Sequence, residues 1–209
     1  MKLYHMSDTL QLGDMLKSDF KRQMELALPF AQALRRGEEC FYAMYFNAKY
    51  LRAVLGKFKL RDMWSDYVKW SVEGIFEYVR RTEFPQCCSR LQCNYYFATL
   101  EEVRALYEID WGKAPEEERL RIRLFEIALE ADQVDRRDMR LFDEAYDIVW
   151  ECDADETHGD IWSHGELTSV MNCARRYFAG EQSAEPIWEL MSDRPATAEK
   201  DLTAYLRKE

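Results

Sequence analysis

Residues 93–107 read CNYYFATLEEVRALY and combine two local patterns. The first part, Tyr95–Phe97, favours a β-strand because three strand-forming aromatic residues follow one another. The second part, Leu100–Tyr107, has apolar residues at helical spacing. Thr99, followed three residues later by Glu102, matches a capping box, the arrangement that starts a helix. The stretch therefore predicts a strand that runs directly into a helix.

Composition indicates a globular chain with its own core. The 209 residues are 47% hydrophobic and 33% charged, which suits one domain of ordinary size. The net charge of −10 gives no general attraction to nucleic acid or to anionic membranes. No apolar run reaches the ~18 residues of a membrane-spanning helix, no signal peptide is evident, and the six cysteines suit a reduced, structural role. We therefore expect a cytoplasmic protein.

The remaining patterns predict an α+β fold. Leu3–Met6 is expected to form a first strand before a turn at Gly13, and three helical segments are expected between about residues 18 and 83. Later patterns predict a strand within residues 120–130, a helix over 161–180 and a strand over 186–191. Three polar stretches are expected outside the core elements: residues 111–119 and 132–138 as connections, and 198–209 as a polar helix or tail.

Tyr96-Phe97-Ala98, with Tyr107 eleven positions after Tyr96, resembles the second motif of the ADP-ribosyltransferase fold, especially its poly(ADP-ribose) polymerase branch. In that family the two tyrosine rings sandwich the nicotinamide of NAD. Residues 77–91, which lead into this motif, resemble an uncharacterised bacterial domain family of the same fold. The resemblance implies a split β-sheet core with a large helical insert after the first strand. It also implies a single domain over residues 1–209 and NAD as cofactor.

The same resemblance implies roles for individual residues. His5, Tyr96 and Glu189 would form the catalytic His-Tyr-Glu set, with His5 bonded to a ribose hydroxyl of the adenosine half of NAD. Tyr107 would stack on the nicotinamide. Glu166 is the reserve candidate for the motif glutamate. A carboxylate close to the anomeric carbon would stabilise the positive charge that develops there as nicotinamide leaves.

Three further residues belong to the expected cofactor site. Arg90 could meet a phosphate of NAD or pair with a carboxylate in its own turn. Met6 stands where the family usually has a glycine whose backbone reaches the nicotinamide amide. Arg104 stands where polymerase relatives place a serine on that amide, and it could donate to the amide oxygen or face solvent. Met6 and Arg104 are departures from the family pattern.

Each of these residues also has a purely structural interpretation. Aromatic residues on a strand and its following helix are core in most proteins, His5 could be a polar residue at a strand end, and Glu189 could face solvent by simple alternation. Two functions follow. The first is an NAD-dependent mono-ADP-ribosyltransferase of the toxin, effector or defence-enzyme kind. We expect it to modify a protein more readily than a nucleic acid and not to act on membranes. The second is a catalytically inactive interaction protein that keeps the transferase-like scaffold.

An acidic stretch, Cys152–Asp160, has some features of a metal loop. Its glycine falls one place late for a calcium loop, and its twelfth position is His164 rather than glutamate. Cys152, His158 and His164 lack a standard zinc spacing. We therefore predict no metal site.

Overall fold

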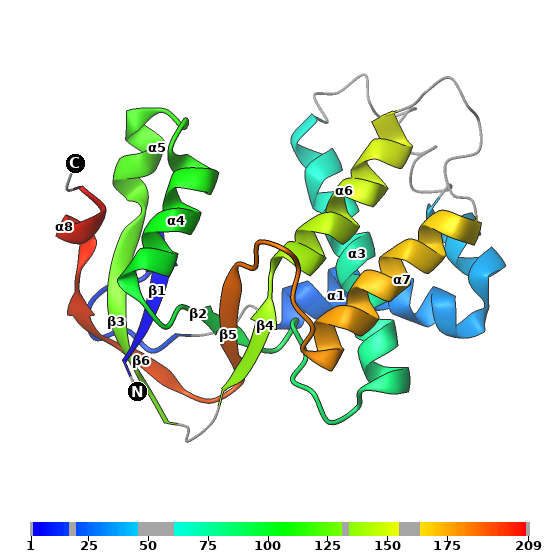
Figure 1. The fold of residues 1–209 in the computed structure, drawn as a ribbon, viewed down its shortest axis with the longest axis horizontal. Coiled ribbons are helices and arrows are strands. Elements are labelled where there is room, and N and C mark those ends of the chain that lie inside the picture. The colour runs from blue at the N-terminus through cyan, green and yellow to red at the C-terminus, as the bar shows by residue number, and fades with distance from the viewer. Residues whose placement is uncertain (1, 17–19, 46–60, 131–133, 155–163, 208–209) are drawn as a thin grey trace.

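The computed structural model describes residues 2–16, 20–45, 61–130, 134–154 and 164–207 (Figure 1). Its strands are β1 (Leu3–Ser7), β2 (Asn94–Tyr96), β3 (Arg123–Leu129), β4 (Asp135–Asp138), β5 (Trp188–Ser192) and β6 (Ala196–Asp201). Its helices are α1 (Phe20–Arg36), α3 (Arg61–Glu83), α4 (Leu100–Trp111), α5 (Glu116–Arg121), α6 (Arg140–Ala154), α7 (His164–Ala179) and α8 (Thr203–Leu206). Residues 38–45 are also helical.

The strands form two antiparallel three-stranded sheets, in the orders β1-β3-β6 and β2-β5-β4. The sheets meet where β1 and β2 come together. There the amide of Tyr4 donates to the carbonyl of Phe97 over 3.0 Å, and the amide of Phe97 donates to the carbonyl of Tyr4 over 2.9 Å. This mixture of helices with two small sheets confirms the α+β prediction.

The junction of β2 and α4 has the predicted capping box. The Thr99 hydroxyl accepts from the amide of Glu102 over 3.1 Å, and the Glu102 carboxylate accepts from the amide of Thr99 over 3.1 Å. Two of the amides left free at the helix start are thereby satisfied. The strand-to-helix prediction from residues 93–107 is therefore confirmed.

Helices α1, α3, α6 and α7 gather on one side of the molecule, while α4, α5 and α8 lie beside the β1-β3-β6 sheet (Figure 1). A large apolar cluster fills the helical side, with Val72, Ile75, Phe76, Leu141 and Tyr177 fully buried. The helical pattern predicted after β1 is confirmed for α1, for residues 38–45 and for α3. The rest of the predicted second segment, residues 46–55, lies outside the described residues.

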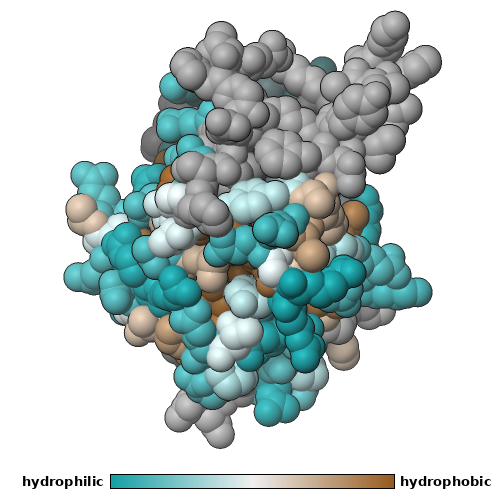
Figure 2. All heavy atoms as spheres, turned by 90° about the vertical axis from the view of Figure 1, so that its right-hand side faces the viewer, coloured by the Kyte–Doolittle hydropathy of each residue, from teal (hydrophilic) through white to brown (hydrophobic). Residues whose placement is uncertain are grey.

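The outer surface of the helical side is mostly polar. Hydrophilic side chains cover most of the described part of the face in Figure 2, and hydrophobic side chains show only in small areas between them. Among the described helices, none combines the length and the apolarity needed to cross a membrane.

Parts of the three polar stretches form elements that we did not expect, whereas the short helix α8 lies within residues 198–209, where a polar helix or tail was expected. Residues 116–121 form α5, with Pro115 just before the first turn, three glutamates at the start and arginines at the end, a charge order that suits the helix dipole. Within 132–138, the polar residues of β4 pair with β5 at the edge of the sheet formed by the described strands. Residues 196–201 form β6, where the small residues Ala196 and Ala198 are buried without giving a strong apolar signal.

The contact between α1 and α3 yields a stability prediction. A Cβ added at Gly74 would lie 2.5 Å from Phe30 Cβ and 2.7 Å from the Ala27 carbonyl oxygen. Alanine should favour the helix by about 1 kcal/mol, whereas overpacking costs about 1–3 kcal/mol. Because the nearest atoms are backbone or close to it, we expect Gly74→Ala to lower the free energy of unfolding by about 1 kcal/mol or more. Urea unfolding measures this.

Gln32→Ala, on the exposed face of α1, is the control and should stay within about 0.5 kcal/mol of wild type. A Gly74→Ala protein as stable as wild type would mean that α1 and α3 do not approach as closely as described.

Candidate functional site

Arg90, in the turn between α3 and β2, is buried between the β2-β5-β4 sheet and the helices. Its Nη1 donates to Glu189 Oε1 over 2.5 Å and to the Tyr177 hydroxyl over 2.7 Å. Its Nε donates to the Glu73 carboxylate over 3.2 Å and 3.3 Å. The Tyr177 hydroxyl in turn donates to Glu189 Oε1 over 2.6 Å. One guanidinium thus joins carboxylates from α3 and β5.

Aromatic rings surround this ion network. The Arg90 guanidinium carbon lies 4.1 Å from the ring centroid of Phe142, 5.1 Å from that of Tyr177 and 5.2 Å from that of Tyr95. Such cation–π contacts strengthen when the cation is removed from water. They hold the planar guanidinium in one orientation.

Burial and charge act in opposite directions on the pKa of Arg90. Burial alone would lower it, but the carboxylates of Glu189 and Glu73 raise the pKa well above its ordinary value. Burial also raises the pKa of Tyr177 well above the usual range, so this hydroxyl keeps its proton and donates to Glu189. Two carboxylates share one cation, and the network carries excess negative charge.

A pocket of about 270 Å³ opens next to Arg90, between α4 and the helices α3 and α6. Its lining combines aromatic rings with carboxylates from separate elements: Trp70, Glu73, Arg90, Tyr95, Asp110, Phe142 and Asp143 are among the residues that form it. We call it the junction pocket. Ligand sites are commonly concave and mostly apolar, with a few convergent polar groups, and the junction pocket is our candidate site.

Two carboxyl groups of the junction pocket have raised pKa values. Burial raises the pKa of Asp110. Burial, opposed by Arg140 and assisted by Glu189, raises the pKa of Asp143 to about 6. Asp143 can therefore gain or lose a proton close to neutral pH, as a general acid or base must.

His5 lies at the meeting point of the two sheets. Its Nδ1 is 2.7 Å from the carbonyl oxygen of Tyr95. Because a carbonyl can only accept, Nδ1 carries the proton and donates. Burial lowers the pKa of His5, with the Tyr95 hydrogen bond acting in the opposite direction, so the ring is neutral at pH 7. In the structure His5 links β1 to β2.

The structure places Tyr96 and Glu189 on opposite faces of the β2–β5 pair. Tyr96 is opposite Leu190, and both pack with Leu3 in a separate apolar cluster. Glu189, one residue earlier on β5, faces Arg90 instead. Because side chains alternate along a strand, Tyr95 and not Tyr96 shares the face of Glu189.

The expected His-Tyr-Glu set is therefore divided. The rings of His5 and Tyr96 lie near each other, with centroids 6.1 Å apart. Tyr96 is fully buried, and burial raises its pKa to about 12. Glu189 lies in the Arg90 network, 3% exposed. The catalytic roles of the three residues stay predictions, and as described the side chains do not line one cavity.

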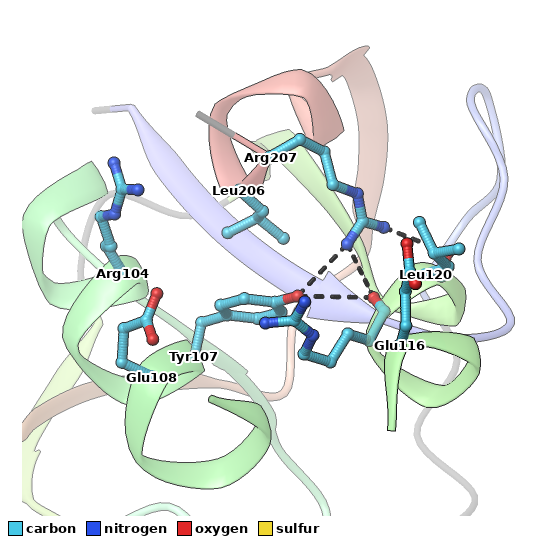
Figure 3. A pocket seen from close by; sticks show the side chains of 8 residues that line it. Arg104, Tyr107, Glu108, Glu116, Leu120, Leu206 and Arg207 are labelled. Carbon is cyan, nitrogen blue, oxygen red and sulfur yellow. Dashed lines mark hydrogen bonds between the residues drawn. The ribbon is translucent and has the colours of Figure 1, made fainter. Parts of the chain in front are cut away.

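The residues predicted to hold nicotinamide are also separated. Tyr107 packs in a third apolar cluster, together with the half-buried Met6. Tyr107 and Arg104 line a second pocket, of about 370 Å³, shown in Figure 3. Because Tyr96 and Tyr107 lie in different clusters, the two rings do not enclose a common space. Glu166, the reserve candidate, is in the first turn of α7 and lines neither pocket.

Of the residues predicted to bind the cofactor, Arg90 lines the junction pocket. Glu189, predicted to be catalytic, contacts Arg90 directly. Sequence reasoning missed Glu73, Tyr95, Asp143 and Tyr177. A signal for Glu73 was available, since it interrupts an apolar run of α3, and a charged residue on a buried helix face needs a partner. Tyr177 gave no such signal because it fits the apolar face of α7. The acidic stretch considered for metal binding lies mostly outside the described residues.

The Arg90 network predicts a large effect of removing its cation. Arg90→Met should leave the Glu73 and Glu189 carboxylates buried and unpaired, which typically costs about 3–5 kcal/mol. Chemical unfolding measures the loss. Arg175→Met, which breaks the exposed pair with Glu83, is the control and should cost no more than about 1 kcal/mol. Equal effects of the two substitutions would contradict a buried network.

The raised pKa of Asp143 predicts how the free energy of unfolding depends on pH. Its folded pKa of about 6 exceeds the ordinary value of 3.8, so the folded protein binds more protons between these values and stability falls as pH rises through them. Asp143→Asn should remove this fall and stabilise the protein at pH 7 by on the order of 1 kcal/mol, allowing for partial exposure. Unfolding between about pH 4 and pH 7 tests it. Asp147→Asn, exposed on the same helix, should keep the wild-type profile, and a wild-type profile for Asp143→Asn would refute the assignment.

A family model described as "Protein of unknown function (DUF2441)" matches residues 3–194, which span β1 to β5 and include both sides of the junction pocket. A search of the curated proteins found no match to the chain. The family match extends over most of the 209 residues. The chain therefore belongs to the DUF2441 family.

Proposed function

We propose that the chain is an NAD-dependent mono-ADP-ribosyltransferase that transfers ADP-ribose to a macromolecule, more readily a protein than a nucleic acid. The junction pocket, of about 270 Å³, would hold the nicotinamide end of NAD, and the rest of the dinucleotide would extend out of it. The observation that carries the proposal is the composition of this pocket. It places aromatic rings and carboxylates beside Arg90, whose guanidinium contacts Glu189. Aromatic rings can stack on nicotinamide, the leaving group, and carboxylates can stabilise the positive charge that develops at the anomeric carbon of the ribose.

The architecture supports the proposal in outline. An ADP-ribosyltransferase-like chain was expected to have a split sheet and a helical insert after its first strand. Two three-stranded sheets that meet at β1 and β2, with α1 and α3 between these strands in the chain, are compatible with that expectation. The finer assignment to the transferase fold is part of the proposal.

The lining of the pocket suits nicotinamide in its oxidised, positively charged form. Tyr95 and Phe142 offer ring faces for stacking, and rings with negative faces attract a cationic heterocycle. The lining has three carboxylates, Glu73, Asp110 and Asp143, against two cations, Lys69 and Arg90. As the bond to nicotinamide breaks, positive charge moves to the ribose, where nearby carboxylates stabilise the transition state more than the ground state.

Arg90 and Glu189 have linked roles in this proposal. Arg90 binds the diphosphate of NAD, because a planar guanidinium matches phosphate oxygens. The diphosphate competes with Glu189 for Nη1 of Arg90 and thereby frees the Glu189 carboxylate for a ribose hydroxyl. The proposal requires this movement because the Glu189 side chain is 4% exposed while it is paired.

The alternative is a catalytically inactive interaction protein that keeps the scaffold. The specific observation in its favour is the separation of Tyr96 from Glu189, together with the neutralisation of Glu189 by Arg90 and Tyr177. In this alternative the ion network serves stability alone.

NAD turnover separates the two functions. We expect the wild-type chain to bind NAD within the usual range of about 1 µM to 1 mM and to release nicotinamide. Glu189→Gln keeps the size of the side chain and one acceptor oxygen, so it should retain NAD binding but lower nicotinamide release by about 10²–10³-fold. Calorimetry measures binding, and chromatography of released nicotinamide measures turnover. Glu185→Gln, an exposed change in the preceding loop, should behave as wild type.

The location of the site has its own test. Asp110 and Glu108 are both on α4, but Asp110 lines the junction pocket and Glu108 lines the pocket that contains Arg104 and Tyr107. Asp110→Asn should weaken NAD binding several-fold, by roughly 1 kcal/mol of lost charge attraction, and Glu108→Gln should not. Failure of the wild-type chain to bind NAD at millimolar concentration would overturn the transferase proposal and leave the interaction protein.

A further inference from the structure

A second pocket, of about 370 Å³, lies among α4, α5 and α8 (Figure 3). Guanidinium groups enter its lining from all three segments: Arg104 from α4, Arg119 from α5 and Arg207 from the residue that follows α8. Two carboxylates, Glu108 and Glu116, also line it. We call it the arginine pocket. It is distinct from the junction pocket, which α4 lines with Leu106, Ile109 and Asp110 instead.

Arg207 is held in place by groups that carry no full negative charge. Its Nη1 donates to the carbonyl of Arg119 over 2.8 Å and to the Tyr107 hydroxyl over 3.2 Å. Its Nη2 donates to the carbonyls of Leu120 and Ile122 over 3.1 Å and 3.0 Å. Figure 3 shows the Arg207 guanidinium beside the Tyr107 hydroxyl. Hydrogen bonds to neutral groups fix the position of this cation without cancelling its charge.

Arg119 contributes an unsatisfied donor. Its Nε is buried and has no hydrogen-bond partner within the part of the chain that the structure describes. A buried donor without an acceptor costs free energy. If the Arg119 side chain turned so that Nε faced the pocket, an anion could accept from Nε and a neighbouring N–H together, the side-on geometry in which arginine binds oxyanions.

The net charge of the lining favours an anion. Three guanidiniums face two carboxylates, on a chain whose net charge is −10. Glu108 is four residues after Arg104 on α4, and Glu116 is three residues before Arg119 on α5, so each carboxylate is about one helical turn from an arginine of the same helix. Among the described residues, the hydrogen bonds of the Arg207 side chain go to backbone carbonyls and to the Tyr107 hydroxyl. A local positive site on an acidic protein concentrates anions.

We propose that the arginine pocket binds a small phosphate-bearing molecule, with Arg119 and Arg207 as the main contacts. Phosphate has several oxygens that can accept from two guanidiniums at once, whereas a carboxylate has two. The volume is at the lower end for ligand sites, which fits a compact phosphorylated molecule rather than a polymer. The inference does not depend on NAD binding at the junction pocket.

Inorganic pyrophosphate is the probe, with binding followed by calorimetry and by the shift in melting temperature of the full chain. Arg119→Gln should weaken pyrophosphate binding by about tenfold or more, because it removes a charge-assisted contact. Glu116→Gln should strengthen binding about threefold or more by removing a repelling carboxylate. Arg175→Gln, at an exposed ion pair outside the pocket, should leave binding unchanged. Binding should also weaken as sodium chloride is raised.

Adenosine monophosphate and ribose 5-phosphate serve as additional arms. Inorganic phosphate is measured beside them as the reference. Tighter binding of either molecule than of inorganic phosphate supports the proposal and identifies the attached group, and equal binding supports a site that recognises phosphate alone. The proposal is overturned if pyrophosphate gives neither heat nor a thermal shift at about 10 mM, well above typical ligand affinities. It is also overturned if Arg119→Gln and Glu116→Gln both bind pyrophosphate like wild type. Nicotinamide release by Arg119→Gln should equal that of wild type, so failure here and failure at the junction pocket are distinguishable.

Discussion

The burial of one arginine between two carboxylates constrains the centre of this protein. Arg90 ties α3 to β5 through Glu73 and Glu189, and Tyr177 of α7 completes the set. Removing charges from water is expensive, and only close pairing with further hydrogen bonds offsets that cost. The helical side and the β2-β5-β4 sheet must therefore keep their relative positions for the network to form. The same arrangement shapes the floor of the junction pocket, so the stability of the centre and the properties of the candidate site are coupled.

Two pockets with different electrostatics lie on the two sides of α4. The junction pocket has aromatic rings and two carboxyl groups with raised pKa values. Such a lining suits a cationic ring and a developing positive charge. The arginine pocket has a rigid cation and an unsatisfied Nε donor, which suits an anion. A molecule with a cationic heterocycle and phosphate groups needs both kinds of surroundings, but the two proposals rest on separate residues and can fail separately.

Local sequence patterns predicted the elements that have strong local signals. The aromatic strand, the capping box at Thr99 and Glu102, and the alternating β3 needed no tertiary information. Strands β4 and β6 escaped prediction because their residues are polar or small and are held by pairing with distant strands. For the site, Arg90 and Glu189 were selected for NAD chemistry, but their mutual contact spans 99 positions and was not predictable from spacing. The face on which Tyr96 lies depends on the register of β2 with β5, which the sequence alone does not determine.

The central claim is that NAD binds in the junction pocket and competes with Glu189 for Arg90. A crystal structure of the chain with NAD bound tests this most directly. The account predicts nicotinamide against Tyr95 and Phe142, the diphosphate on the Arg90 guanidinium, and Glu189 released toward the ribose. A complex in which the junction pocket holds no part of NAD, or in which Arg90 and Glu189 stay paired beneath it, would contradict the account.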